Sequence, residues 1–321
     1  MFDVKKMVEE IVSKKEIKNI SFTGVGGSLA CFYAPYYYVM REAKNITTSY
    51  TSSNEFVHDT PSCVGENSIV VISSRGGNTA ETVEAGRVAK KLGATVVGMT
   101  HEDEDNGIKE VSDYVILFKD LSEDVYEVSK TGYILKIAME TLHQVEGSGQ
   151  YEAMCDAMKK MNTLLPSPEK AIVPEAIKFS IDYKNDKIIY TMGSGTAWSA
   201  AQQQQICIFM EMQWINSAVI HTGEFFHGPF EITDPDTAFL LLKSTGKTQP
   251  LDERAINFLN DYNHHLTVID PEKYGLKDLG EVSEYFDYDF HTAMLGVFNN
   301  LLADMRNHPL SKRKYMWKYK Y

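Results

Sequence analysis

Residues 19–28 read NISFTGVGGS, and this stretch decides the fold class. Asn19 to Thr23 is expected to form a short strand that runs directly into the glycine turn Gly24-Val25-Gly26-Gly27. A helix is expected to follow from Ser28 to Ala43. A strand, a glycine-rich turn and a helix in this order indicate a βαβ unit, whose strands lie parallel in one sheet.

The first half of the chain continues this alternation. Residues 68–73, SIVVIS, form a continuous apolar run of the kind that is buried on both faces of a parallel sheet. A glycine-rich turn at 74–79 follows, and then a helix is expected from Ala80 to Leu92. Further strands are expected at 46–50, 94–99 and 114–117, with a turn or short helix at 53–58.

The second half repeats the plan of the first. IIYTMGSGT at 188–196 resembles ISFTGVGGS at 20–28, and LTVID at 266–270 resembles ATVVGMT at 94–100. LLLKSTG at 240–246 stands where the first half has its second buried strand and turn. The similarity is weak in letters but consistent in order, which predicts two copies of one α/β sandwich.

Four parts are expected along the chain. A first domain with its N-terminal helix takes residues 1–147, and a helical connector with two prolines takes 148–170. The second domain takes 171–305, and a C-terminal tail takes 306–321. The tail ends in HPLSKRKYMWKYKY, a basic and aromatic sequence that is typical of a segment packed on a surface.

Composition narrows the function classes. The chain has 321 residues, 43% hydrophobic content, a net charge of −12 and a pI near 5.3. This acidity argues against a general nucleic-acid binder and against binding to an anionic membrane surface. An anionic small ligand stays compatible with it, because helix N-termini and backbone N–H groups bind phosphate without net positive charge.

Cysteine spacing and the N-terminus bear on location. The four cysteines show no CxxC spacing, a pattern typical of a reduced, cytosolic protein without a zinc motif. The N-terminal residues lack the apolar core of a signal peptide, and no run approaches the about 18 apolar residues of a membrane span. We therefore expect a cytoplasmic protein that binds neither membrane nor nucleic acid.

Two turns are rich in glycine and hydroxyl side chains: GVGGS at 24–28 and SRGGNT at 74–79. Open α/β sheets bind ligands at the C-terminal ends of their strands. Turns of this kind aim backbone N–H groups and hydroxyls outward, and phosphate is their natural ligand. Neither turn completes the GxGxxG or Walker pattern, so NAD and ATP are not expected. The alternative is that these glycines only permit tight βα turns.

The second domain carries a counterpart turn, Gly193-Ser194-Gly195-Thr196. It can be a second phosphate site, a contact to the sugar body or a structural relic. Its neighbour, Lys243-Ser244-Thr245-Gly246, has no matching run of donors followed by a threonine helix start. We therefore expect one phosphate site per chain, in the first domain.

Proton-transfer groups are expected after the second domain's first turn. The apolar stretch from Ile206 to Trp214 carries one carboxylate, Glu211, and burying a lone carboxylate costs free energy unless it has a partner or a task. The turn from Gly223 to Pro229 then presents His227. A carboxylate and a histidine can move protons at neutral pH. The alternative is a solvated glutamate at a helix edge and a loop histidine.

A metal site is not expected in this segment. His221, Glu224 and His227 stand three residues apart, but the pattern is not HExxH. Gly223, Gly228 and a proline discourage the continuous helix that such a site needs.

These motifs resemble the sugar isomerase (SIS) domain family. The resemblance rests on GVGGS, on SSRGGNTAET at 73–82, on the spacing of Glu211 and His227 with EFFHGP at 224–229, and on the basic tail. It covers nearly the whole chain as two tandem SIS domains, each a flavodoxin-like three-layer αβα sandwich with a parallel sheet. It is strongest for the fructosamine-6-phosphate deglycases, which are related to the isomerase half of glucosamine-6-phosphate synthase.

The resemblance implies a reaction and a set of site residues. A deglycase would cleave a phosphorylated Amadori product, with an amino acid on C1, to glucose 6-phosphate and free amino acid through an enaminol and an imine. It would need no cofactor. Glu211 matches the catalytic carboxylate, His227 the histidine of ring opening and proton transfer, and Lys318 the lysine of a tail that covers the active site. The implied phosphate-binding residues are Gly26, Ser28, Ser74, Arg75, Gly77, Asn78 and Thr79.

The chain departs from the family pattern in one loop position, and the family implies a second copy of the chain as partner. The related loop reads SxSGxT, whereas Gly76 stands here in place of the second serine. Either Arg75 and backbone N–H groups would hold the phosphate, or the phosphate would be held less tightly. The family tends to form dimers, and His227 would then serve the pocket of the other protomer. Two other functions stay open: an aldose–ketose or ammonia-dependent amino-sugar isomerase, and a non-catalytic sugar-phosphate sensor.

Overall fold

The computed structural model describes residues 1–120, 125–147 and 150–320. The chain divides into two compact units, Met1–Asn162 and Thr163–Tyr321. The division falls near the end of helix α8 (Tyr151–Leu164), inside the connector predicted for 148–170. The predicted limits of the four parts of the chain stay predictions.

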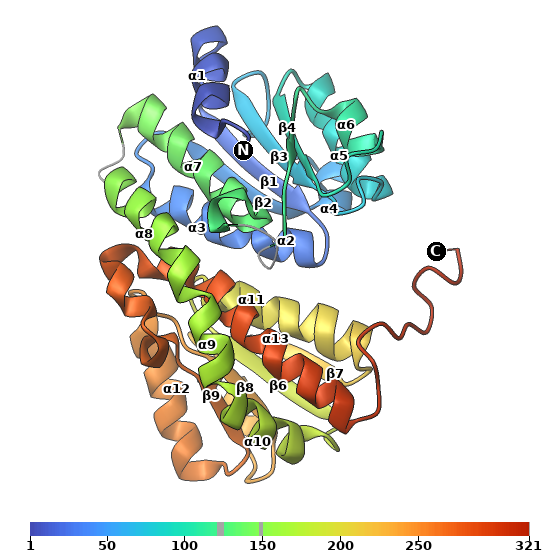
Figure 1. Cartoon of the computed structure of the whole chain (residues 1–321), viewed down its shortest axis with the longest axis vertical. Helices are drawn as coiled ribbons and strands as arrows, with labels where there is room; N and C mark the ends of the chain where they lie inside the picture. Colours follow the sequence, from blue (N-terminus) through green and yellow to red (C-terminus); the bar gives the residue numbers. More distant parts are fainter. Residues whose placement is uncertain (121–124, 148–149, 321) are drawn as a thin grey trace. The chain divides into compact units, whose positions relative to one another are not determined.

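The first unit is built on one parallel sheet of five strands with the order β2-β1-β3-β4-β5 (Figure 1). In register, Phe22 of β1 lies between Tyr50 of β2 and Val71 of β3. Reversal of the strand order next to β1 is the flavodoxin-like arrangement, which agrees with the expected fold class. The strands are β1 (Asn19–Gly24), β2 (Thr47–Ser52), β3 (Ser68–Ser73), β4 (Thr95–Thr100) and β5 (Tyr114–Leu117).

Helices cover both faces of this sheet. Figure 1 shows α1, α3 and α7 on one face and α4, α5 and α6 on the other, so the unit has three layers. The helices are α1 (Val4–Lys14), α2 (Gly27–Cys31), α3 (Tyr33–Glu42), α4 (Ser53–His58), α5 (Ala80–Lys91), α6 (Gly107–Val111), the short η1 (Tyr126–Val128) and α7 (Lys130–Glu146).

The single helix predicted for residues 28–43 was wrong, because the structure has two helices there, α2 and α3. Pro35 lies in the first turn of α3. Proline has no N–H to donate to the residue four positions earlier, and its ring crowds that residue's carbonyl group, so a helix tolerates it only in the first turn. Pro35 therefore requires a new helix to begin shortly before it.

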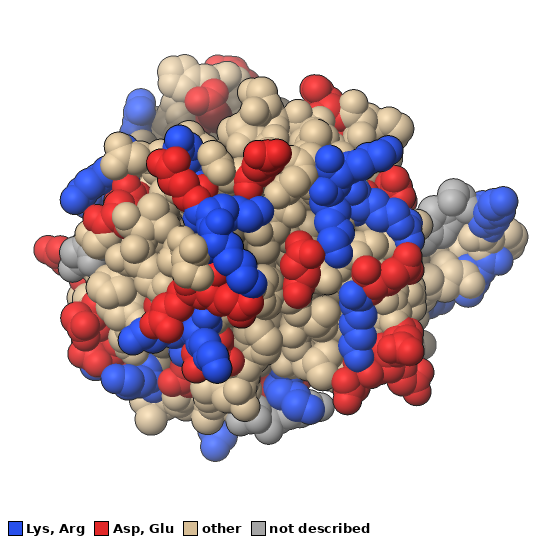
Figure 2. All heavy atoms as spheres, turned by 90° about the horizontal axis from the view of Figure 1, so that it is seen from above, with Lys and Arg blue, Asp and Glu red and all other residues tan. Residues whose placement is uncertain are grey.

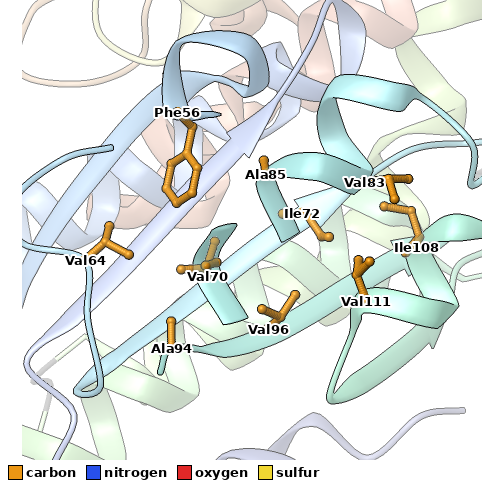
Figure 3. Close-up of a cluster of buried hydrophobic side chains, with 11 residues drawn as sticks. Phe56, Val64, Val70, Ile72, Val83, Ala85, Ala94, Val96, Ile108 and Val111 are labelled. Carbon is orange, nitrogen blue, oxygen red and sulfur yellow. The ribbon is translucent and has the colours of Figure 1, made fainter. Parts of the chain in front are cut away.

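A buried aliphatic cluster fixes β3 in the middle of the sheet (Figure 3). Val70 and Ile72 of β3 and Val96 of β4 meet Val83 of α5 and Ile108 of α6, and most of them are fully buried. Burial of one such side chain stabilises the fold by about 1.5–3 kcal/mol. The turn that follows Ser73 is therefore held on a rigid support.

The second unit repeats the arrangement with four parallel strands in the order β7-β6-β8-β9. They are β6 (Ile188–Gly193), β7 (Asn216–His221), β8 (Phe239–Leu242) and β9 (Leu266–Ile269). The internal repeat predicted from the sequence is confirmed, because the strands at 188–193, 239–242 and 266–269 hold the same places as β1, β3 and β4.

Two layers of helices also flank the second sheet. Thr191 Oγ1 of β6 donates a hydrogen bond to the Ala201 carbonyl oxygen of α11 (3.0 Å), whereas its neighbour Met192 packs with Leu259 of α12. Successive side chains of a strand point to opposite faces, so α11 and α12 lie on opposite faces of the sheet. The remaining elements are α9 (Pro166–Ala171), α10 (Val173–Tyr183), α11 (Ala197–Gln203), the π-helical η2 (Gln204–Met212), η3 (Pro229–Ile232), α12 (Gln249–Tyr262), η4 (Pro271–Tyr274), η5 (Leu276–Phe286) and α13 (Asp287–Met305).

On the face shown in Figure 2, acidic and basic side chains are interspersed. Across the described part of the chain, no helix has the length and apolar character to cross a bilayer.

Candidate functional site

The two predicted phosphate turns lie at the carboxyl ends of neighbouring strands of the first sheet. Gly24-Val25-Gly26-Gly27-Ser28 follows β1 and residues 74–79 follow β3, and these two strands are hydrogen-bonded neighbours. β2 lies on one side of β1, and the chain then crosses β1 to form β3 on its other side. This is the topological switch point, where open α/β sheets bind their ligands.

A lysine that sequence reasoning missed reaches the first turn. Lys130 Nζ donates a hydrogen bond to Ser28 Oγ (2.7 Å). Lys130 begins α7, whose preceding residue, Ser129, caps the helix by accepting from the Gly132 N–H. An ammonium group beside a hydroxyl adds positive charge to a turn that otherwise offers only dipoles, which favours an anionic ligand.

Two hydroxyl groups of the second turn lie within hydrogen-bond distance of each other. Ser74 is 4% exposed, and its Oγ lies 2.8 Å from Thr79 Oγ1. Gly77 has a φ of 71°, and a Cβ there would lie 2.2 Å from the Asn106 side chain. Only glycine fits that position, so the turn holds its shape through Gly77.

Two other predicted phosphate residues already have partners in the protein. Arg75 forms a bidentate ion pair with Asp120, with N–O distances of 2.6 and 2.7 Å, and this guanidinium lowers the pKa of Asp120. Asn78 Oδ1 accepts a hydrogen bond from the Gly107 N–H (2.9 Å). Their roles in phosphate binding stay predictions, and Arg75 would have to leave Asp120 to replace the hydroxyl absent at Gly76.

Ser74→Ala is expected to raise KM for a phosphorylated substrate by about 10–100-fold, because it removes a hydrogen bond to a charged group. Steady-state kinetics would measure the change. Ser13→Ala, which removes an exposed hydroxyl from α1, should leave KM unchanged. An unchanged KM in Ser74→Ala would show that the Ser74 hydroxyl does not contact the phosphate.

The corresponding turns of the second unit already hold an acidic group of the chain. Asp287, at the start of α13, is fully buried and accepts hydrogen bonds from Ser244 Oγ (2.9 Å), Thr245 Oγ1 (2.7 Å) and the Thr245 N–H (3.1 Å). Burial raises the pKa of Asp287 to about 7, against these hydrogen bonds. The carboxyl group occupies the donors that a phosphate would need, which supports a single phosphate site in the first domain.

Asp287→Ala is expected to lower the free energy of unfolding by about 3 kcal/mol, because it leaves buried donors of Ser244 and Thr245 without an acceptor. Urea denaturation would measure the loss. Asp304→Ala on the exposed side of the same helix is the matched control and should change stability little. A loss of equal size in both variants would contradict this role of Asp287.

Glu211 is not the lone carboxylate that the sequence suggested. It lies in the last turn of η2, and its Oε1 is 2.8 Å from a terminal nitrogen of Arg313. The Glu211 side chain is 22% exposed and that of Arg313 is 8% exposed. The free-energy cost of burial expected for Glu211 is therefore offset by a partner in the C-terminal tail. π-Helical segments are rare and occur frequently at functional sites.

Glu211 and Arg313 lie in a pocket of about 540 Å³. Trp214, in its wall, has a φ of 56°, a left-handed conformation that costs free energy in a bulky residue and is found mainly where function requires it. Lys312 Nζ lies 5.0 Å from the centre of the Trp214 ring. The other lining residues are Ile206, Met210, Ile215, Asn216, Lys314, Tyr315 and Met316.

His227 lies on a turn that is anchored by its aromatic neighbours. Phe225 is fully buried, and Phe226 and Phe230 pack against Phe258 of α12. His227 itself is exposed and is not among the residues that line the Glu211 pocket. The turn packs on the α12 face of the sheet, whereas η2 continues α11 on the opposite face.

The described tail residues give Lys318 a local partner. Lys318 is exposed, and its Nζ donates to the Arg313 carbonyl oxygen (2.6 Å). Tyr315, Trp317 and Tyr319 are exposed as well. Among the described residues, no cluster of three His, Cys, Asp or Glu side chains is placed to hold a metal ion.

Comparison with known proteins decides the family. A model of the SIS domain matches residues 13–128. The fructosamine deglycase FrlB of Bacillus subtilis (strain 168) is 36% identical over 308 residues, which are 96% of this chain and 94% of that protein. The chain belongs to the SIS domain family. A fructoselysine 6-phosphate deglycase of Escherichia coli (strain K12) is 24% identical to this SIS protein over 83% of the chain and 77% of its own length.

Solved structures agree with the fold. One from Salmonella typhimurium LT2 superposes with a TM-score of 0.95 at 43% identity, over 99% of this chain and 96% of its own. The C-terminal domain of glucosamine-fructose-6-phosphate aminotransferase from Francisella tularensis superposes with a TM-score of 0.75 at 14% identity, over 95% of this chain and 88% of its own. At that identity the second likeness concerns the fold alone.

Proposed function

We propose that this SIS protein is a fructosamine 6-phosphate deglycase, which converts a phosphorylated Amadori product and water to glucose 6-phosphate and a free amino acid. The observation that carries the proposal is the 36% identity to FrlB over nearly the full length of both proteins. The hydroxyl-lined turns at the switch point and the carboxylate in a pocket are the parts that such a reaction needs.

The phosphate provides the binding energy. We place it at the first unit's turns, with Ser28 and Lys130 on one side and Ser74 and Thr79 on the other. A phosphate distant from the reacting carbons holds them against the catalytic groups, and its binding energy is used to orient them. The predicted contributions of Gly26, Arg75, Gly77 and Asn78 belong to the same proposal.

Proton transfer accomplishes the chemistry. His227 moves a proton to the ring oxygen, and the sugar opens to its 2-keto form. Glu211 removes a proton from C1, which gives an enaminol. C2 then accepts a proton, and C1 becomes double-bonded to the nitrogen as an imine. Water adds to C1, the C1–N bond breaks, and the nitrogen leaves as a protonated amine. Protein groups and water supply every proton, so the proposed reaction needs no cofactor.

His227 is proposed to act in the pocket of a second copy of the chain. His227 and Glu211 are carried on opposite faces of the second sheet, and His227 does not line the Glu211 pocket. A symmetric dimer would bring the histidine of one protomer to the carboxylate of the other. Lys318 belongs to this proposal as a tail residue that helps to close the site, and the cytoplasm is the proposed location.

A substrate comparison tests the proposed function. The purified protein is given a phosphorylated fructosamine in one reaction and fructose 6-phosphate with ammonia in another. Release of glucose 6-phosphate from the first alone is the expected result. Formation of glucosamine 6-phosphate in the second would instead assign an amino-sugar isomerase, and binding without turnover in both would assign a sensor.

A further inference from the structure

The pocket around Glu211 has a basic side as well as an apolar one. Ile206, Met210 and Trp214 are each more than 40% exposed and provide the apolar wall. Arg313 and Lys314 of the tail provide the basic side. A pocket with an apolar wall and two adjacent cations suits an organic anion.

One of the hydrogen-bond donors of Arg313 has no partner in the described part of the chain. One terminal nitrogen donates to the carbonyl oxygens of Leu310 (2.6 Å) and Lys312 (3.0 Å), and the other contacts Glu211 (2.8 Å). Its Nε is buried and has no hydrogen-bond partner among the described residues. An unpaired buried donor is costly, and the Nε edge of a guanidinium is the edge that binds a carboxylate side-on through two hydrogen bonds.

We propose that the Nε edge of Arg313 binds the α-carboxylate of the amino acid attached to C1, an inference that rests on the proposed deglycase function. The substrate carboxylate takes over the guanidinium that otherwise pairs with Glu211. Glu211 loses its counter-ion in the same event and is left beside C1 as the base. Substrate binding thereby prepares the proton abstraction.

The distance between Arg313 and Glu211 sets the substrate class. A base must reach hydrogen-bond distance of C1, and Arg313 lies 2.8 Å from that base. In an Amadori product of an α-amino group, three bonds join C1 to the carboxylate carbon, a span of about 4 Å. In a lysine modified on its side-chain amine, seven bonds separate C1 from the carboxylate carbon, about 9 Å when extended. The pocket therefore favours α-linked products.

The experiment compares two phosphorylated fructosamines that differ only in the carboxylate: the product of glycine and the product of methylamine. Wild-type protein is expected to show a kcat/KM about 10–100-fold higher for the glycine compound, as a charge-assisted hydrogen bond allows. Equal kcat/KM values would overturn the inference alone. Absence of glucose 6-phosphate from both compounds would overturn the proposed function and this inference with it.

Variants separate recognition from a structural effect on Glu211. Arg313→Gln is expected to lose the preference for the glycine compound while it still converts the methylamine compound. Lys320→Gln removes a positive charge from the same tail and should retain the preference. If Arg313→Gln lowers kcat/KM equally for the two compounds, Arg313 only positions Glu211 and the inference is wrong.

Discussion

Glu211→Gln is expected to lower kcat for glucose 6-phosphate release by about a thousandfold or more, because an amide cannot take a proton from C1 and general-base catalysis contributes 10²–10⁴-fold. Binding of the product should persist, since the phosphate is held by other groups. Steady-state kinetics would measure kcat, and titration calorimetry with glucose 6-phosphate would measure binding.

Glu231→Gln is the matched control for this variant. Glu231 is an exposed carboxylate of the same unit, and its loss changes the net charge equally. The control should retain wild-type kcat. A Glu211→Gln protein with near-normal kcat would remove Glu211 from the catalytic role, and one that fails to bind glucose 6-phosphate would indicate that the variant no longer folds properly.

His227→Asn is expected to be inactive alone and to recover activity when paired with Glu211→Gln. The two chains are co-expressed with different affinity tags and purified over both. In such a heterodimer one site has the Glu211 of one chain and the His227 of the other, so about half of the wild-type activity should return. The gain is large because each parent homodimer lacks one proton-transfer group in both of its sites.

Two outcomes of this pairing would contradict the shared site. A doubly tagged species that forms but stays inactive would place both residues in the pocket of one chain. Failure to recover any doubly tagged species would show that the protein does not associate as proposed. Glu231→Gln paired with His227→Asn is the control, and it restores only one intact site.

Local sequence signals predicted most of the fold. The apolar run at 68–73 can satisfy its backbone and bury its side chains only as a central strand, and it is β3. The repeat at 188–193 predicted the second sheet for the same reason. The prediction of a single helix for 28–43 was wrong, although Pro35 already indicated that a new helix begins shortly before it.

The contacts within the site could not be predicted in the same way. Arg313 and Glu211, Lys130 and Ser28, and Asp287 and Thr245 are pairs far apart in sequence, and no local periodicity relates their members. Only the cost of burying Glu211 indicated that a partner was required. The partner's identity depends on how the tail packs.

The second unit shows how the turns of a repeat can keep the fold while their hydroxyl groups serve a structural contact. Its turns retain Ser194, Ser244 and Thr245, all of them buried. Ser244 and Thr245 donate to Asp287, which ties α13 to this end of the sheet, whereas Ser194 donates to Thr248. The sequence showed the hydroxyl groups, but the carboxyl group that uses them comes from a helix that begins about 40 residues later and could not be assigned to them.

The central claim is that the carbonyl character moves from C2 to C1 before the C1–N bond breaks. The most direct test is the reaction of an α-linked fructosamine 6-phosphate in deuterium oxide, followed by NMR of the phosphorylated product. The account predicts glucose 6-phosphate with deuterium on C2, together with an equal amount of free amino acid. Fructose 6-phosphate as the product would contradict it, because the C1–N bond would then have broken without the shift.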